Sequence, residues 1–142
     1  MITLSEHLCF KTYVVSRHMT GLYKPYLDKI SLTYPQYLVM LILWENGGMN
    51  IGKIGEYLHL DNGTLTPLLK RMEKNGLLSR TRSIDDERVV LIDLTMDGKL
   101  LKDKAKHIPE AVQMCFHLDE EKKKHLKSVL DEILSTQSTS KI

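Results

Sequence analysis

The chain has 142 residues, of which 42% are hydrophobic and 27% are charged, and its formal net charge is +2. This size and composition predict one compact, soluble domain with a hydrophobic core. The small net charge excludes nucleic-acid binding through overall charge, so any basic site must be a local patch.

No membrane or export segment is expected. No apolar run approaches the roughly 18 residues that a membrane helix needs. The start, MITLSEHLCF, lacks the basic region and the long apolar core of a signal peptide. We therefore expect a cytosolic protein, whose two cysteines are reduced, catalytic or redox-sensing rather than a permanent disulfide.

The first predicted element is an N-terminal helix. Thr3 and Glu6 have the spacing of a capping box, which predicts that the helix begins at Thr3. Pro25 is expected to kink or end it late. The apolar residues that recur at helical spacing are Leu8, Val15, Met19, Leu22 and Tyr26.

The next segment, TYPQYLVMLILWENGG, is apolar throughout from Tyr37 to Trp44, which fits a buried strand or a buried helix. Thr33 and Gln36 form a second capping-box pattern, and Pro35 lies in the first turn, where a missing N–H costs little. These signals favour a helix that ends at the glycine pair, residues 47–48.

Two helices joined by a short turn follow. NIGKIGEYLHL is predicted to be a short helix despite its two glycines, because its apolar residues share one side. DNGTLTPLLKRMEKNGLL, residues 61–78, is predicted to be a helix with Asp61 or Asn62 as its N-cap and Gly76 at its end. Its core-facing residues are expected to be Leu65, Leu68, Leu69 and Met72. Such a pair is a helix-turn-helix pattern.

After Gly76 the pattern becomes strand-like. LLSRTRS and VVLIDLT, separated by the charged IDDER, predict a hairpin with a polar tip. Thr95 can cap a helix that Pro109 bends, and Asp119 can cap a last helix. The apolar stripe of the first of these is Leu101, Ala105, Ile108, Val112 and Cys115, and that of the second is Leu126, Val129, Leu130, Ile133 and Leu134.

The predicted element order is α-α-α-α-β-β-α-α. It indicates a mainly α fold of the α+β class: a winged helix-turn-helix with long N- and C-terminal dimerisation helices. We predict a single domain over residues 1–142, with the winged helix-turn-helix at 34–94 and dimerisation helices at 1–30 and 96–136. The long apolar stripes of the terminal helices need partners, and two interleaved copies of the chain would supply them, so we infer a homodimer.

The polar side of the 61–78 helix carries hydroxyls at its amino end and cations behind them. The major groove of DNA admits one α-helix, where short hydroxyl side chains touch base edges and cations reach phosphates. Arginines on the hairpin suit phosphates or a narrow minor groove, and Asp86 is placed to hold Arg88. The candidate residues for binding double-stranded DNA are Thr64, Thr66, Lys70, Arg71, Lys74, Arg80, Arg82, Asp86 and Arg88. A solvated basic face is the alternative for any one of them, but the helix pair and the arginine-bearing hairpin occur together.

Four segments resemble the MarR family of transcriptional regulators, over about residues 8–109. They are LCFKTY, LTYPQYLVMLILWE, LDNGTLTPLLKRMEKNGLLSRTRS and DDERVVLIDLT. The aspartate–x–arginine of the wing is general to that family and matches Asp86 and Arg88, whereas GTLTPLLKRME is more specific to its organic-hydroperoxide-sensing, OhrR-like branch. The resemblance implies a dimeric winged helix that represses transcription by binding a pseudo-palindromic operator.

Cys9 is the candidate redox sensor. A thiol must be partly thiolate to react with peroxide, and Cys9 is expected two turns into the first helix, where the helix dipole helps little. Tyr13, one turn further on, can donate a hydrogen bond to it. The resemblance implies that Cys9 is the reactive cysteine and that Tyr23 and Tyr34 of the other subunit hydrogen-bond it. From spacing alone, an inert core cysteine and two dimer-core tyrosines are equally compatible with these residues.

Cys115 has two possible roles. Some members of the family carry a second cysteine near the end of the chain that resolves the oxidised sensor into an intersubunit disulfide, and Cys115 falls in about that region. Core packing is the alternative, because Cys115 belongs to an apolar stripe. A zinc site built from the pairs His7–Cys9 and Cys115–His117 is disfavoured, since residues two apart on a helix point about 200° apart. We expect no metal and no cofactor.

The sequence therefore predicts a regulator and not an enzyme: a repressor that leaves its operator when an organic hydroperoxide oxidises Cys9. A MarR-type regulator gated by a small phenolic ligand is an alternative of the same class. A thiol peroxidase that uses Cys9 and Cys115 is an alternative of another class. It is disfavoured because no suitable base or arginine lies beside Cys9 and the basic wing would have no role.

Overall fold

The structure is a computed structural model that describes residues 3–136. The chain divides into two compact units, Met1–Pro109 and Glu110–Ile142. No helix within residues 3–136 combines the length and the apolar character that a membrane span requires. The prediction of one domain with two dimerisation segments concerns the assembled protein, and it stays a prediction.

The N-terminal helix begins later than the sequence predicts. The Thr3 side chain makes no capping hydrogen bond, and Leu4–Glu6 form a short 3₁₀ helix. His7 is extended, with ψ at 114°, so it separates this turn from α1, Leu8–Gly21. The predicted capping box is therefore wrong, and Cys9 lies in the first turn of α1 rather than two turns into it.

A break follows α1 before the predicted proline. The chain turns at residues 22–23 and continues as α2, Lys24–Leu27, with Pro25 in its first turn, and as a 3₁₀ helix, Asp28–Ile30. Pro25 thus begins a new helix, where its missing N–H has no helical partner to lose. The first helix therefore ends at Gly21, before Pro25, so the prediction that Pro25 itself kinks or ends it is wrong.

The second capping box forms as predicted and starts α3, Tyr34–Asn46. The Thr33 backbone N–H donates to Gln36 Oε1 at 3.0 Å, and the Gln36 backbone N–H donates to Thr33 Oγ1 at 3.4 Å. This apolar helix forms the centre of the core of the first unit. The buried apolar residues of α3 are Tyr37, Val39, Met40, Ile42 and Leu43.

The predicted helix pair consists of α4, Ile51–Leu58, and α5, Asn62–Lys74. Gly76, with φ at 75°, adopts the left-handed conformation that closes a helix without steric cost. The predicted core face of α5 is confirmed, and its four apolar residues are at most 8% exposed. The α4 helix packs against both α3 and α5.

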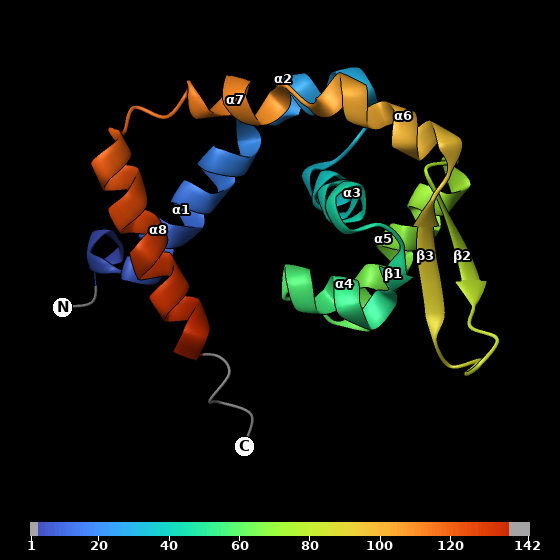
Figure 1. Cartoon of the computed structure of the whole chain (residues 1–142). Coiled ribbons are helices and arrows are strands. Elements are labelled where there is room, and N and C mark those ends of the chain that lie inside the picture. Colours follow the sequence, from blue (N-terminus) through green and yellow to red (C-terminus); the bar gives the residue numbers. More distant parts are fainter. Residues whose placement is uncertain (1–2, 137–142) are drawn as a thin grey trace. The chain divides into compact units, whose positions relative to one another are not determined.

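The wing is a three-stranded antiparallel sheet rather than a two-stranded hairpin. β2, Leu78–Arg82, pairs with β3, Val90–Leu94, and Arg82 is opposite Val90 next to the tip. A short strand that the sequence analysis missed, β1, Met49–Asn50, pairs with the other edge of β3. The order is therefore β1-β3-β2, and Figure 1 shows the β2–β3 hairpin extending beyond α5.

The α6 helix, Met96–Ala105, is fastened to the winged part by its amino end. Thr95 caps it as predicted, by accepting from the Gly98 N–H at 3.1 Å. The Gly98 carbonyl in turn accepts a hydrogen bond from the Trp44 indole at 2.8 Å. A Cβ on Gly98 would lie only 2.1 Å from the Leu77 carbonyl oxygen, so this close packing requires glycine.

The predicted bent helix is two helices. α6 ends at Ala105, and α7, Ile108–Gln113, follows a turn at residues 106–107. Cys115 lies in the turn after α7 and is exposed, so its predicted place on an apolar helical stripe is wrong. The last helix, α8, Glu120–Ser135, is capped by Asp119 as predicted, through a 2.8 Å bond from the Lys122 N–H.

The terminal helices leave apolar side chains uncovered in the single chain. No residue of α1 or of α8 is buried. The large apolar or aromatic residues that are exposed on α1 are Leu8, Phe10, Tyr13, Val14 and Val15, and those on α8 are Val129, Leu130, Ile133 and Leu134. Helices with such faces normally pack against a partner.

Candidate DNA-binding surface and sulfur site

The front of α5, which we call the reading helix, is organised by its cap. Asp61 accepts a 2.7 Å hydrogen bond from the Thr64 N–H. Bonds from the backbone and the side chain of Thr64 hold the pKa of Asp61 below its ordinary value. The Thr66 hydroxyl donates to the Asn62 carbonyl at 2.7 Å. Both threonine hydroxyl protons are therefore engaged, so these side chains offer oxygen lone pairs and methyl groups to a ligand.

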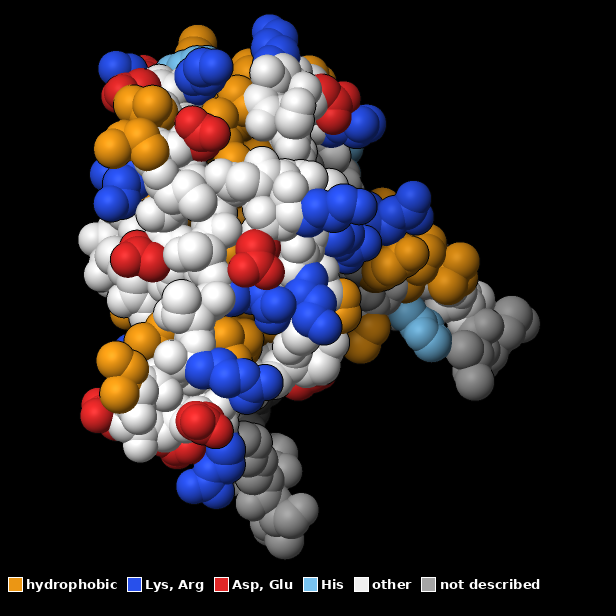
Figure 2. Space-filling model, turned by 90° about the vertical axis from the view of Figure 1, so that its right-hand side faces the viewer, with side chains coloured by type: hydrophobic (Ala, Val, Ile, Leu, Met, Phe, Trp, Pro, Cys, Tyr) orange, Lys and Arg blue, Asp and Glu red, His pale blue; other side chains and the backbone are white. Residues whose placement is uncertain are grey.

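Cations line the rest of the exposed side of the reading helix. Lys70, Arg71 and Lys74 are all exposed, as the sequence predicts for residues that reach phosphates. Figure 2 shows one face of the chain, on which Lys and Arg side chains form several small groups with Asp and Glu side chains between them. This mixture agrees with a small net charge and with local basic sites.

Arg80 is less available than the sequence suggests. Its Nε donates to Glu73 Oε2 at 2.9 Å, and its side chain is only 22% exposed. The Arg80 side-chain bond, more than any other contact, holds the pKa of Glu73 below its ordinary value. Arg82 donates from Nη1 to the Glu87 carbonyl at 2.9 Å, which links β2 to the wing loop. Both arginines therefore brace the wing.

Arg88 is the exposed cation of the wing. Asp86 accepts from the Arg88 backbone N–H at 3.0 Å and from its Nε at 3.2 Å, as predicted. The Arg88 side chain is nevertheless 92% exposed, so its terminal nitrogens face solvent. Asp86 thus bonds the backbone N–H and the Nε of Arg88, which orients the arginine side chain and leaves its terminal nitrogens uncovered.

A polar cleft lies between α4, the reading helix and β3, and the sequence analysis did not anticipate it. Its volume is about 380 Å³, and it is lined by Asn50, Ile51, Gly52, Asn62, Thr66, Arg88, Val89 and Val90. Asn50 also caps α4, by accepting from the Lys53 N–H at 2.8 Å. An asparagine just before an apolar helix predicts a helix cap, but it does not predict a cleft.

Cys9 is the second residue of α1, and its side chain is exposed. The macrodipole acts mainly on the first turn of a helix, and the sequence prediction that Cys9 lies beyond that turn is wrong. Tyr13, one turn on, is 59% exposed and stacks under the Arg17 guanidinium at 5.5 Å. Tyr13 and Arg17 thus lie on the same helix as Cys9.

Tyr23 and Tyr34 lie together, at a centroid distance of 4.9 Å, and both contact Tyr37. Burial raises the pKa of both Tyr23 and Tyr34, and burial together with these neighbours raises that of Tyr37 to about 12. The three rings therefore keep their phenolic protons as hydrogen-bond donors at neutral pH. The buried Tyr37 hydroxyl has no partner within residues 3–136.

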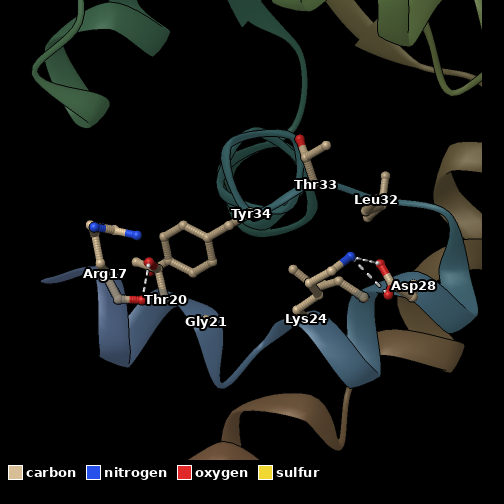
Figure 3. A pocket seen from close by; sticks show the side chains of 9 residues that line it. Arg17, Thr20, Gly21, Lys24, Asp28, Leu32, Thr33 and Tyr34 are labelled. Atoms are coloured by element: carbon tan, nitrogen blue, oxygen red, sulfur yellow. Dashed lines mark hydrogen bonds and ion pairs between the residues drawn. The ribbon is translucent and has the colours of Figure 1, made fainter.

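Tyr34 also closes a pocket of about 410 Å³ between the end of α1, α2 and the start of α3. Figure 3 shows the Tyr34 ring reaching from α3 toward Arg17 and Thr20 of α1. On the other side of the pocket, Lys24 and Asp28 form an ion pair at 3.0 Å. The family resemblance implied that Tyr23 and Tyr34 serve a common site; their rings are in contact, and their role in that site stays a prediction.

Cys115 is exposed in the second unit, and its thiol donates a weak hydrogen bond to the Ala111 carbonyl at 3.5 Å. It is not a packed core residue of that unit. The argument against zinc assumed that both histidines lie on helices. That assumption is wrong, because His7 is extended and His117 lies between α7 and α8. Within residues 3–136, no three His, Cys, Asp or Glu side chains are grouped as for a metal.

The sequence profile of the family described as Transcriptional regulator SarA/Rot matches residues 21–105. The chain belongs to the SarA/Rot family of transcriptional regulators. This SarA/Rot-family chain is 53% identical, over 133 residues, to the organic hydroperoxide resistance transcriptional regulator of Bacillus subtilis (strain 168). The match covers 94% of the chain and 90% of the relative, and it confirms the resemblance to the organic-hydroperoxide branch.

Solved structures of a second relative, AbfR of Staphylococcus epidermidis, are similar to this SarA/Rot-family chain as well. Reduced AbfR bound to DNA has a TM-score of 0.78 at 36% identity, and overoxidised AbfR bound to DNA has 0.77 at 35%. These matches cover 94% of each chain. Disulfide-formed AbfR has a TM-score of 0.66 at 35% identity, with 92% of each chain covered. The predicted winged-helix fold is confirmed.

Proposed function

We propose that this protein is a homodimeric, DNA-binding repressor that leaves its operator when an organic hydroperoxide oxidises Cys9. The observation that carries the proposal is the reading helix followed by a wing whose Arg88 is exposed and held by Asp86. The B. subtilis relative, named for organic hydroperoxide resistance, supports the signal. The proposed operator is double-stranded DNA, and we expect the protein to bind it in the cytoplasm.

The DNA contacts divide between two elements. The reading helix enters the major groove, where Thr64 and Thr66 present acceptors and methyl groups to the bases, and Lys70, Arg71 and Lys74 bind phosphates. The wing brings Arg88 to the adjacent minor groove, with Asp86 holding it. Arg80 and Arg82 support the wing through their bonds to Glu73 and Glu87.

The uncovered helix faces support a dimer. Leu8 is 72% exposed on α1 and Ile133 is 52% exposed on α8, and a second copy would cover faces of this kind. Two copies related by a twofold axis place two reading helices about 34 Å apart, one turn of DNA, which matches a pseudo-palindromic operator.

The redox step begins at Cys9. The Cys9 thiolate attacks the distal oxygen of the hydroperoxide and the O–O bond breaks, which gives Cys9 sulfenic acid and an alkoxide that takes a proton from water to become an alcohol. Tyr23 and Tyr34 of the partner subunit keep their phenolic protons and donate hydrogen bonds to the sulfur. Tyr13 stands on the same helix as Cys9 and supports it.

The second step uses Cys115 as the resolving thiol. The Cys115 sulfur of one subunit attacks the sulfenic sulfur of the other, water leaves, and an intersubunit disulfide forms. The exposure of Cys115 in the single chain supports this role over core packing. The solved structure of disulfide-formed AbfR, a relative with 35% identity to this chain, supports disulfide formation as a step.

The test compares DNA binding by wild type and Cys9→Ser, each reduced and then treated with cumene hydroperoxide. Wild type is expected to bind a selected duplex when reduced and to release it after treatment, whereas Cys9→Ser binds in both states. Equal release of both proteins would overturn the redox mechanism, and release of Cys9→Ser by salicylate would favour a phenolic ligand. Steady consumption of peroxide with a dithiol, without DNA binding, would instead identify a thiol peroxidase.

A further inference from the structure

The polar cleft beside the reading helix is a meeting point of three elements. Asn50 and Gly52 come from the start of α4, Asn62 and Thr66 from the reading helix, and Arg88 from the wing. No Asp or Glu side chain lines it. A cleft of about 380 Å³ with amides and a guanidinium, but no carboxylate, suits an anionic group.

The place of the cleft indicates which anion it binds, if the proposed function holds. A reading helix in the major groove and a wing in the adjacent minor groove are separated by one DNA strand, since the sugar-phosphate backbone forms the border between the grooves. That strand must pass between the reading helix and the wing, which is where the cleft lies.

The donors of the cleft remain available. Asn50 uses its carbonyl oxygen to cap α4, so its NH₂ group is left over. Within residues 3–136, neither the Asn50 nor the Asn62 side-chain NH₂ group donates a hydrogen bond to another residue. Arg88 uses only its Nε toward Asp86. Thr66 is not a donor here, because its proton is bound to the Asn62 carbonyl.

We propose that this cleft seats one phosphodiester of the DNA backbone, held by the side-chain amides of Asn50 and Asn62 and by one terminal nitrogen of Arg88, whose other terminal nitrogen points into the minor groove. Val89 and Val90 form an apolar wall for the adjoining deoxyribose. A phosphate contact carries no base sequence but fixes the register of the protein on the duplex. The proposal rests on the proposed function and adds a phosphate clamp that joins the reading helix to the wing.

Asn50→Asp tests the clamp without removing the helix cap. Aspartate caps a helix as well as asparagine does, but it replaces the donating NH₂ with a negative oxygen. Reduced Asn50→Asp is expected to lose at least about tenfold in affinity, both for a duplex selected by wild type and for a random duplex, because the contact is to the backbone. An unchanged melting temperature verifies the fold.

Asn75→Asp is the matched control. Asn75 is exposed, caps the other end of the reading helix and does not line the cleft, so it adds the same charge elsewhere. It is expected to lose much less affinity than Asn50→Asp. Equal losses in the two variants would overturn the clamp, and so would a loss by Asn50→Asp that is confined to the selected duplex.

A single neutral phosphate locates the contact. In the selected duplex, each phosphate is replaced in turn by a methylphosphonate, and the affinities of wild type and Asn50→Asp are measured. At one phosphate per half-site the replacement is expected to weaken wild type but to strengthen Asn50→Asp. If no methylphosphonate affects wild type and Asn50→Asp differently, the clamp is overturned, but the proposed repressor function is not. Failure of reduced wild type to bind any duplex would overturn the repressor and the clamp together.

Discussion

Arg80 and Glu73 tie the end of the reading helix to the first strand of the wing. The Arg80 Nε donates to Glu73 Oε2 at 2.9 Å, and the Arg80 backbone N–H donates to Oε1 of the same carboxylate at 3.3 Å. One carboxylate thus fixes both the backbone and the side chain of the strand. The angle between reading helix and wing therefore depends on Arg80, which the sequence analysis assigned to DNA binding, and on its bonds to Glu73.

Glu73→Gln is expected to lower the melting temperature at neutral pH. The bonds from Arg80 hold the pKa of Glu73 below its ordinary value of 4.5, so the ionised form is the one that stabilises the fold. This contribution is fully present above pH 4.5 and is lost as the pH falls through the folded-state pKa. The difference in melting temperature between wild type and Glu73→Gln should therefore shrink toward acid pH.

Glu56→Gln is the control for that measurement, because Glu56 is exposed on α4 and forms no ion pair with another residue of the described chain. It removes the same charge and should change the melting temperature little at any pH. A deficit of Glu73→Gln that stays constant down to pH 3 would show that the pair contributes no ionic stabilisation.

Arg88→Ala and Asp86→Asn should differ in their effect on DNA affinity. The exposed Arg88 loses its contact with the groove entirely when truncated, which we expect to cost about tenfold or more. Asp86→Asn removes only an exposed ion pair, worth up to about 1 kcal/mol, or roughly fivefold. Fluorescence anisotropy with a labelled duplex measures both. A larger loss for Asp86→Asn would contradict the assigned roles.

Tyr34→Phe is expected to slow the oxidation of Cys9 about tenfold, because a hydrogen bond to a charged group is lost. Burial and the neighbouring Tyr23 raise the pKa of Tyr34, so its proton remains available as a donor throughout the neutral range. Mass spectrometry of Cys9 after timed exposure to cumene hydroperoxide gives the rate. Tyr57→Phe, at an exposed position of α4, should react like wild type, and an equal rate in Tyr34→Phe would remove Tyr34 from the site.

Cys115→Ser separates the two sulfur steps. Oxidised wild type should run as a dimer on a non-reducing denaturing gel, and Cys115→Ser should run as a monomer with Cys9 at the sulfenic or a higher oxidation state. Treatment of the oxidised wild type with dithiothreitol before electrophoresis should return it to a monomer. A covalent dimer formed by Cys115→Ser, or none formed by wild type, would assign another fate to the Cys9 sulfenate.

Short-range signals in the sequence determined most of the secondary structure. The caps at Thr33, Asp61, Thr95 and Asp119 formed as predicted, because each needs only a side-chain oxygen within three residues of a free N–H. The cap predicted at Thr3 did not form, because the Glu6 backbone N–H donates to the Thr3 carbonyl oxygen at 3.2 Å and not to the Thr3 side chain. Helical spacing also gave the buried side of the reading helix correctly.

The tertiary structure decided which polar groups are available. Arg80 and Arg82 look alike in the sequence, yet Arg80 bonds a carboxylate seven residues earlier and Arg82 bonds a carbonyl across the wing loop. The cleft at Asn50 and Asn62 exists only because β3 folds back beside α4 and the reading helix. The local sequence pattern determines the helix or strand in which a residue lies. Contacts between distant segments determine which of its polar groups remain free to bind a ligand.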